Sequence, residues 1–173
     1  MIESATNRSV HNIGTRQQLC PVIRGGMDFH KVHNLCTAHF VRAKFNVVLL
    51  GLLGDGKTSL ALAAGPGGLR GWVFNLRHGF DELVHRLRTA ETGRHYDQQL
   101  QAYLRPAVLI VDDFGSQAID QTAAFMVLQA ISGKHDRGSA IVTSSKSFTD
   151  WRHILGDESW PPPSSTGFYS TVT

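Results

Sequence analysis

The sequence predicts an α/β fold in which a parallel sheet of about four strands is covered by helices on both faces. Short apolar runs alternate with segments whose apolar residues recur at helical spacing, an alternation typical of parallel sheets with helical crossovers. The first apolar run leads through a glycine-rich loop, "GLLGDGKT", directly into a helix. A chain of 173 residues is long enough for one domain with a hydrophobic core.

The first half of the chain contains two expected strands. Residues 1–27 are polar, without a clear period, and predict a flexible arm. A short helix is expected over 27–44, and the β-branched and leucine run 46–50, "NVVLL", predicts a buried strand. Residues 57–64 predict a helix that "GPGG" ends, and "GWVFNL", residues 71–76, predicts the second strand.

The second half contains two more strands. Leucine, valine and alanine at helical spacing predict a helix over 81–93. "AVLIVDD", residues 107–113, predicts a third strand that ends in two carboxylates, and an apolar helix is expected at 121–133. "SAIVTSS", residues 139–145, predicts the fourth strand, and a short helix is expected at 147–155.

The ends of the chain divide it into three expected segments. Three prolines in "WPPPSSTGFYSTVT" exclude a helix there and predict an irregular Pro/Ser-rich tail. A fifth strand is either missing or formed from this tail. The expected segments are a flexible arm at 1–27, one domain at 28–158 and the irregular tail at 159–173.

Composition excludes several classes of protein. Lys and Arg number 17 against 14 Asp and Glu, a net charge of +3; this permits contact with DNA but does not argue for it, because the basic residues are scattered. Two cysteines, Cys20 and Cys36, are too few for a disulfide framework. The N-terminus has no apolar signal segment and no apolar run could span a bilayer, so we expect a cytoplasmic protein.

The strongest motif is "GLLGDGKT", which fits the phosphate-binding pattern G-x-x-x-x-G-K-[ST]. Its glycines allow the backbone N–H groups to wrap a phosphate chain, and the following helix directs its positive end at the phosphates. Lys57 is expected to reach the β- and γ-phosphates of ATP, and Thr58 to place its hydroxyl on Mg²⁺. The predicted nucleotide-binding residues are Gly51, Gly54, Asp55, Gly56, Lys57, Thr58 and Ser59.

Two features of this loop keep an alternative open. A glycine-rich turn that binds nothing has the same composition, although the preceding strand and following helix favour phosphate binding. Asp55 places a carboxylate in a loop built for anions, and it weakens affinity if its side chain points inward.

Two further strands end in polar residues. Asp112 is delivered to the carboxyl edge of the sheet, where it can hold Mg²⁺, and Asp113 can orient or deprotonate an attacking water. The fourth strand ends in Thr143, Ser144 and Ser145, of which one can touch the γ-phosphate or that water. The alternatives are a solvated Asp-Asp turn and ordinary turn residues.

Two clusters are interpreted as exposed helix faces. Four possible zinc ligands recur at every third position: His30, His33, Cys36 and His39. On a helix this spacing drifts by about 60° per step, so the four cannot surround one ion. The second cluster, a possible DNA-binding face, consists of Arg86, Arg88, Arg94 and Arg105.

The chain resembles the IstB/DnaC-like ATPases of the AAA+ class, helper ATPases of bacterial insertion sequences and loaders of replicative helicases. The resemblance covers about 28–158 and is carried by "NVVLLGLLGDGKTSLALA", "FDELVHRLRTAE", "LRPAVLIVDDFG" and "DRGSAIVTSSKSFTDWRHILGD". It implies a three-layer P-loop NTPase fold of the AAA+ (ASCE) type with strand order 1-4-3-2. It also implies that Lys57 and Asp113 act in catalysis with Ser145 at the sensor position, and that Thr58 and Asp112 hold Mg²⁺.

The sequence departs from the family pattern at several positions. Leu52 and Leu53 stand where relatives carry prolines, and Ser59 follows Thr58 where histidine is frequent. Ser145 stands at the sensor position in place of asparagine, which puts γ-phosphate sensing in question. No arginine follows Arg152, whereas relatives supply one to a neighbouring subunit, so the chain resembles a truncated copy.

The resemblance implies binding of Mg²⁺ and ATP, with hydrolysis in intact relatives that assists DNA transposition or helicase loading. The implied partners are DNA and a transposase or helicase, with a homo-oligomer possible. One alternative is a hydrolysis-defective remnant that only binds nucleotide. The other is a P-loop kinase of a small molecule, which would need an arginine-rich lid over the phosphates.

Overall fold

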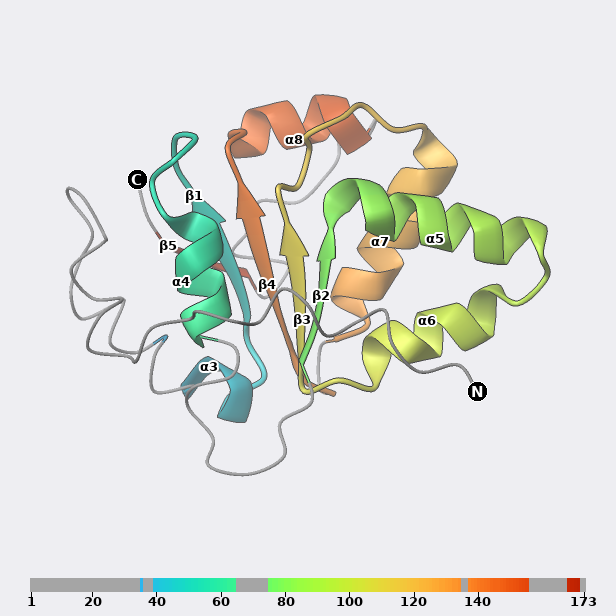
Figure 1. The fold of residues 1–173 in the computed structure, drawn as a ribbon, viewed down its shortest axis with the longest axis horizontal. Coiled ribbons are helices and arrows are strands. Elements are labelled where there is room, and N and C mark those ends of the chain that lie inside the picture. The colour runs from blue at the N-terminus through green and yellow to red at the C-terminus, as the bar shows by residue number, and fades with distance from the viewer. Residues whose placement is uncertain (1–34, 36–38, 65–74, 135–136, 156–167, 172–173) are drawn as a thin grey trace, which may run out of the picture.

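In the part of the chain that the structure describes, five strands form a parallel sheet at the centre of the protein. The computed structural model describes residues 35, 39–64, 75–134, 137–155 and 168–171 (Figure 1). The strands are β1 (Asn46–Leu50), β2 (Asn75–Gly79), β3 (Val108–Asp112), β4 (Ser139–Ser144) and β5 (Phe168–Thr171). Their spatial order is β2-β3-β4-β1-β5, and every neighbouring pair is parallel. The predicted order 1-4-3-2 of the first four strands is confirmed.

Helices cover both faces of the sheet, giving three layers (Figure 1). The helices described in full are α3 (His39–Arg42), α4 (Lys57–Ala64), α5 (Phe80–Thr92), α6 (Tyr96–Leu104), α7 (Gln121–Ser132) and α8 (Phe148–Leu155). Val108 and Ile110 of β3 pack with α3 and α4, whereas Leu109 and Val111 pack with α5 to α8. Successive strand residues point to opposite faces, so a fully buried strand such as β3 is apolar on both.

The register of the strands brings the predicted motifs to one edge of the sheet. Leu50 at the end of β1 pairs with Ser144 at the end of β4, and Gly79 at the end of β2 pairs with Asp112. All strands run in the same direction, so their carboxyl ends meet at this edge. Ligands of open α/β sheets bind there.

The second strand extends beyond the end that the sequence predicted. The prediction of 71–76 followed the apolar run "GWVFNL", but β2 spans Asn75–Gly79; residues 71–74 lie outside the described part of the chain. Among the described strands β2 has a neighbour on one side only, so it tolerates a half-exposed Arg77 and a polar His78. These residues removed the apolar signal on which the prediction relied.

Helix α6 (Tyr96–Leu104) was not predicted. Its buried residues Leu100, Tyr103 and Leu104 lie at helical spacing, a short signal between the stronger patterns of α5 and β3. Of the helix predicted at 27–44, the structure describes Leu35 and the segment His39–Arg42, and α3 ends before Lys44, whose φ is 57°.

The fifth strand comes from the tail, one of the two alternatives for it. Phe168–Thr171 pairs with β1 in parallel, so these four residues are not irregular. The rest of the predicted tail and the predicted arm 1–27 lie outside the described residues. None of the described helices is long and apolar enough to cross a membrane.

Candidate nucleotide-binding site

The loop between β1 and α4 has the backbone that the glycine pattern requires. Gly54 and Gly56 have φ values of 90° and 85°, a region that residues with a Cβ atom rarely adopt. The N–H group of Gly51 donates to the carbonyl of Ser144 at 3.3 Å, which ties the start of the loop to β4. Helix α4 begins at Lys57 and points its N-terminal end toward the loop.

Two charged side chains of the loop bond to the loop itself. Lys57 Nζ donates to the carbonyl oxygens of Gly51 at 2.8 Å and Leu52 at 2.6 Å. Asp55 Oδ2 accepts the N–H group of Leu52 at 2.7 Å. Lys57 therefore lies across the loop, and the exposed Asp55 carboxylate occupies one of the backbone donors.

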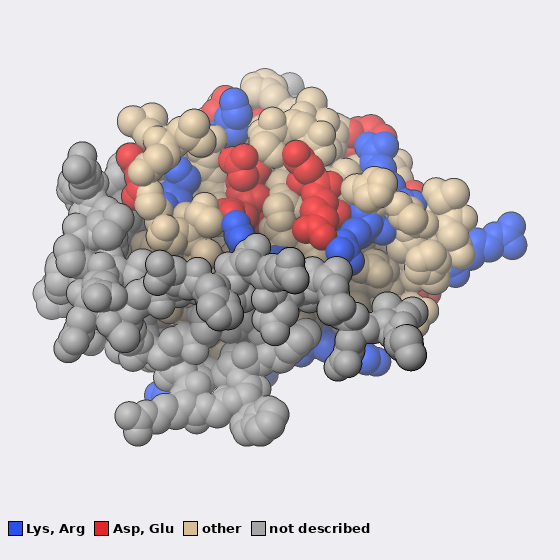
Figure 2. Space-filling model, in the orientation of Figure 1, with Lys and Arg blue, Asp and Glu red and all other residues tan. Residues whose placement is uncertain are grey.

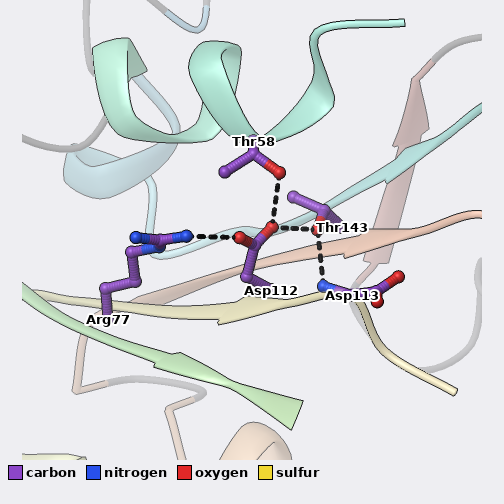
Figure 3. Close-up of polar contacts among 5 residues, drawn as sticks. All are labelled: Thr58, Arg77, Asp112, Asp113 and Thr143. Carbon is purple, nitrogen blue, oxygen red and sulfur yellow. Dashed lines mark hydrogen bonds and ion pairs between the residues drawn. The ribbon is translucent and has the colours of Figure 1, made fainter. Parts of the chain in front are cut away.

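Asp112 receives three side-chain donors from three different elements (Figure 3). Its Oδ1 accepts from Thr58 Oγ1 at 2.8 Å and from Thr143 Oγ1 at 2.6 Å. Its Oδ2 accepts from a guanidinium nitrogen of Arg77 at 2.6 Å. The carboxylate is thus linked to α4, β4 and β2, and only 8% of the residue is exposed.

The pKa of Asp112 lies below its ordinary value. Burial raises this pKa, but the hydrogen bonds from Thr143, Arg77 and Thr58, together with the charge of Arg77, outweigh burial. Donors to a carboxylate favour its charged form. Asp112 is therefore an anion at neutral pH, the form that attracts a cation.

Thr143 also fixes the next residue, Asp113. Thr143 Oγ1 accepts the N–H group of Asp113 at 2.9 Å while it donates to Asp112. Asp113 has a φ of 59°, uncommon for a residue with a side chain. The Asp113 carboxylate is exposed and points away from Asp112 (Figure 3), which leaves it available to a molecule in the cavity.

An open cavity of about 430 Å³ joins the three motifs. Its lining consists of Leu53, Gly54, Gly56, Lys57, Thr58, Ser59, Asp112, Asp113, Thr143 and Ser145. Of the residues predicted for the site, Gly51 and Asp55 are not part of this lining. The structure thus brings the loop, both carboxylates and Ser145 around one space.

The residues at this cavity fit a bound cation beside a phosphate chain. Thr58 donates its one hydroxyl proton to Asp112, so its oxygen lone pairs remain for a metal. Mg²⁺ prefers hydroxyl, carboxylate, water and phosphate oxygens. Thr58 and Asp112 would hold the ion directly or through water, and the loop and α4 would hold the phosphates.

The two remaining clusters are the histidine and cysteine set and the four arginines, both interpreted from the sequence as exposed helix faces. His30, His33 and Cys36 lie outside the described part of the chain; within that part no group of three or more metal-ligating side chains occurs. Arg86 pairs with Glu82 and Arg88 with Asp120. Figure 2 shows basic side chains interspersed with acidic ones over the described part of the face in view.

Sequence reasoning missed Arg77. Nothing in the spacing of "FNLRHGF" connects it with "VDD" 35 residues later. A usable signal would have been the pairing of β2 beside β3, which places Arg77 next to Ile110, two residues before Asp112. Thr143 was one of three candidates at its strand end, and the structure distinguishes it from Ser144, which bonds instead to the Phe114 carbonyl.

The sheet order and the strand–loop–helix unit define a P-loop NTPase fold of the AAA+ class. A model of the family described as IstB-like ATP binding protein matches residues 22–161. This covers most of the chain, and the protein belongs to the IstB-like ATP binding protein family.

Relatives encoded by insertion sequences agree with this assignment. The chain is 34% identical over 134 residues to the protein described as an ATP-binding protein of insertion sequence IS5376 from Geobacillus stearothermophilus, covering 76% of this chain and 52% of that protein. It is 31% identical over 145 residues to the ATP-binding protein of insertion sequence IS21 from Pseudomonas aeruginosa, covering 84% of this chain and 55% of that protein. The chain thus spans about half the length of these relatives.

Solved structures share the fold at low identity. The DnaC helicase loader superposes with a TM-score of 0.63 at 19% identity, covering 86% of this chain and 94% of that one. Domain III of the replication initiation protein DnaA from Thermotoga maritima superposes with a TM-score of 0.68 at 12% identity, covering 87% and 64%. A DnaA bound to AMPPCP and single-stranded DNA gives a TM-score of 0.64 at 13% identity, covering 90% and 49%.

Proposed function

We propose that this protein binds ATP together with Mg²⁺ in the cavity at the carboxyl edge of the sheet. The observation that carries the proposal is the hydrogen bond from Thr58 to Asp112, at 2.8 Å. It links the phosphate loop to the second motif and leaves the Thr58 oxygen free to coordinate a metal. Lys57 would exchange the carbonyls of its own loop for phosphate oxygens, which are stronger acceptors for an ammonium group.

The test is thermal denaturation with and without ATP and Mg²⁺. A ligand that binds only the folded state stabilises it by about 2.7 kcal/mol at a concentration of 100 Kd. We expect ATP with Mg²⁺ to raise the melting temperature and the Lys57→Ala variant to show a much smaller rise. Equal rises in both proteins would contradict the proposed site.

We further propose that the protein hydrolyses ATP and that Asp113 orients the attacking water. Asp113 lines the cavity on a backbone held by Thr143, and a positioned carboxylate can accept a proton from water. The test is phosphate release by the wild type beside Lys57→Ala and Asp113→Asn. Release at one rate from all three would rule out turnover at this site.

A second candidate function is ATP binding without turnover. Ser145 favours it: this exposed serine lines the cavity at the position where the family's sensor is an amide, and its single hydroxyl reaches less far. This candidate predicts nucleotide binding with no phosphate release even at high protein concentration. A Ser145→Asn variant that begins to release phosphate would support it.

The biological setting follows from the relatives and is a proposal for this chain. Related proteins are described as ATP-binding proteins of insertion sequences, a helicase loader and a replication initiator bound to single-stranded DNA. We propose a role in DNA transposition or helicase loading in the cytoplasm, with DNA and a transposase or helicase as partners. DNA-stimulated phosphate release would support this role.

A further inference from the structure

Arg77 lies in the candidate site, although neither the phosphate loop nor the strand-end motifs include it. It comes from β2, where it pairs with Ile110 of β3. Ile110 packs in the cluster that α4 covers, and residues paired in a sheet share a face. Arg77 therefore lies on the same face of the sheet as Asp112, the face that α4 covers (Figure 3).

The Arg77 guanidinium and the Thr58 hydroxyl bond to different oxygens of one carboxylate (Figure 3). Arg77 bonds to Oδ2 at 2.6 Å, while Oδ1 accepts the hydroxyls of Thr58 and Thr143. The arginine side chain is 48% exposed, whereas the Asp112 side chain is 11% exposed. The charge of Asp112 is thus balanced by a cation from the protein itself.

A metal ion at Thr58 would have to share Asp112 with this guanidinium. Mg²⁺ binds oxygen at about 2.1 Å, and Thr58 Oγ1 is 2.8 Å from Asp112 Oδ1, so the ion would lie within a few ångströms of the carboxylate. Two cations around one carboxylate repel each other, more strongly in a partly buried site than in water. Arg77 therefore opposes the metal.

The same ion pair has the opposite effect on a nucleotide without metal. An unbalanced Asp112 would repel the phosphates across the cavity, and Arg77 removes most of that repulsion. We propose that Arg77 sets the metal dependence of the site: by neutralising Asp112 it lets the protein hold ATP with less help from Mg²⁺ than the carboxylate alone would require. This inference rests on the proposed binding of ATP.

The test is the ratio of two dissociation constants of a fluorescent ATP analogue, one in excess EDTA and one in saturating Mg²⁺. Arg77→Ala removes the balancing charge, so binding in EDTA weakens while Mg²⁺ binds more readily. We expect the ratio of the dissociation constant in EDTA to that in Mg²⁺ to rise about fivefold or more. The Mg²⁺ concentration that gives half of the full increase in ATP affinity should fall. Arg77→Lys, which keeps a charge, should restore most of the wild-type ratio.

The matched control is Arg86→Ala, which removes an exposed arginine of α5 that is bonded to Glu82 and does not line the cavity. Its ratio should equal that of the wild type. Arg77→Gln retains a donor for Asp112 without the charge and should behave like Arg77→Ala, which provides a second variant if alanine impairs folding.

The outcomes separate the two proposals. An unchanged ratio in Arg77→Ala and Arg77→Gln, with ATP still bound, would overturn the role of Arg77 and leave the proposed function standing. If the variants bound the analogue more weakly by the same factor in EDTA and in Mg²⁺, the role of Arg77 would also be overturned. A loss of structure alone would raise both dissociation constants by the same factor. Failure of the wild type to bind the analogue in either condition would overturn the proposed function, and the role of Arg77 with it.

Discussion

Asp55 is the acidic residue of the phosphate loop, and its position has a direct consequence for affinity. Its carboxylate accepts the Leu52 N–H group at 2.7 Å, so it stabilises the loop while adding a negative charge beside the expected phosphates. The sequence raised this possibility, and the structure shows the carboxylate bonded within the loop. The stabilising bond and the unfavourable charge can be separated by substitution.

Asp55→Asn keeps an acceptor for Leu52 and removes the charge, so we expect tighter ATP binding, by about two- to fivefold at low salt. The gain should shrink as salt screens the exposed charge. The measurement is the dissociation constant of ATP at low and high ionic strength. Asp97→Asn, at an exposed position in α6, is the control, and equal affinities for all three proteins would show that the phosphates do not sense Asp55.

Thr143 connects the two carboxyl residues and can be tested through stability. Thr143→Val keeps the shape but leaves the Asp113 N–H group and one Asp112 oxygen without this partner, so we expect a loss of about 1–2 kcal/mol in the free energy of unfolding at neutral pH. The pKa of Asp112 is lower in the folded protein than its ordinary value of 3.8. The charged Asp112 carboxylate therefore adds to the free energy of unfolding above pH 3.8, and this contribution is lost as the pH falls through the lower pKa of the folded state.

The variant should therefore differ less from the wild type below pH 3.8 than at neutral pH. Urea denaturation over this range makes the measurement. Thr92→Val, which removes an exposed hydroxyl bonded to a carbonyl of its own helix, should show no such pH dependence. A constant difference between Thr143→Val and the wild type at all pH values would contradict the linkage to Asp112.

At the scale of elements, a buried lysine joins the ends of two helices. Lys134 follows α7 and is fully buried; its Nζ donates to the carbonyl of Leu104 at 3.1 Å and to that of Pro106. Those carbonyls lie at the end of α6 and just before β3. Burial lowers the pKa of Lys134 from 10.5 to about 8, because the charged form is less stable away from water.

This pKa predicts an alkaline stability change. Between about pH 8 and 10.5 the unfolded chain binds more protons at Lys134 than the folded one, so the contribution of Lys134 to the free energy of unfolding rises with pH over this range. Lys134→Met should lack this rise. Urea denaturation at several pH values tests the difference between the two proteins, and parallel curves would contradict the lowered pKa.

Elements differed in how far the sequence could predict them. The buried strands β1, β3 and β4 were recognisable because their central residues are apolar on both faces of the sheet. The end of β2 was predicted too early, because the exposed Arg77 and the polar His78 interrupt the apolar run. Helix α6 was missed because its signal rests on Leu100, Tyr103 and Leu104 alone.

For the whole molecule, chain order alone could not supply the contacts between distant strands. The spacing of "GLLGDGKT" and "VDD" predicted that Lys57, Thr58, Asp112 and Asp113 would share a site, and the structure brings them to one cavity. The contact of Arg77 with Asp112 depends on β2 lying beside β3. The fifth strand depends on a tail segment that pairs with β1 and carries no strong strand pattern of its own.

The central claim is that this fold holds ATP through the loop after β1, and calorimetric titration of ATP in the presence of Mg²⁺ tests it most directly. We expect one ATP bound per chain in the wild type. Lys57→Ala should bind at least about tenfold more weakly, because a charge-assisted hydrogen bond to phosphate is worth roughly 1.5–3 kcal/mol. Heat of binding that is absent in the wild type, or identical in Lys57→Ala, would contradict the claim.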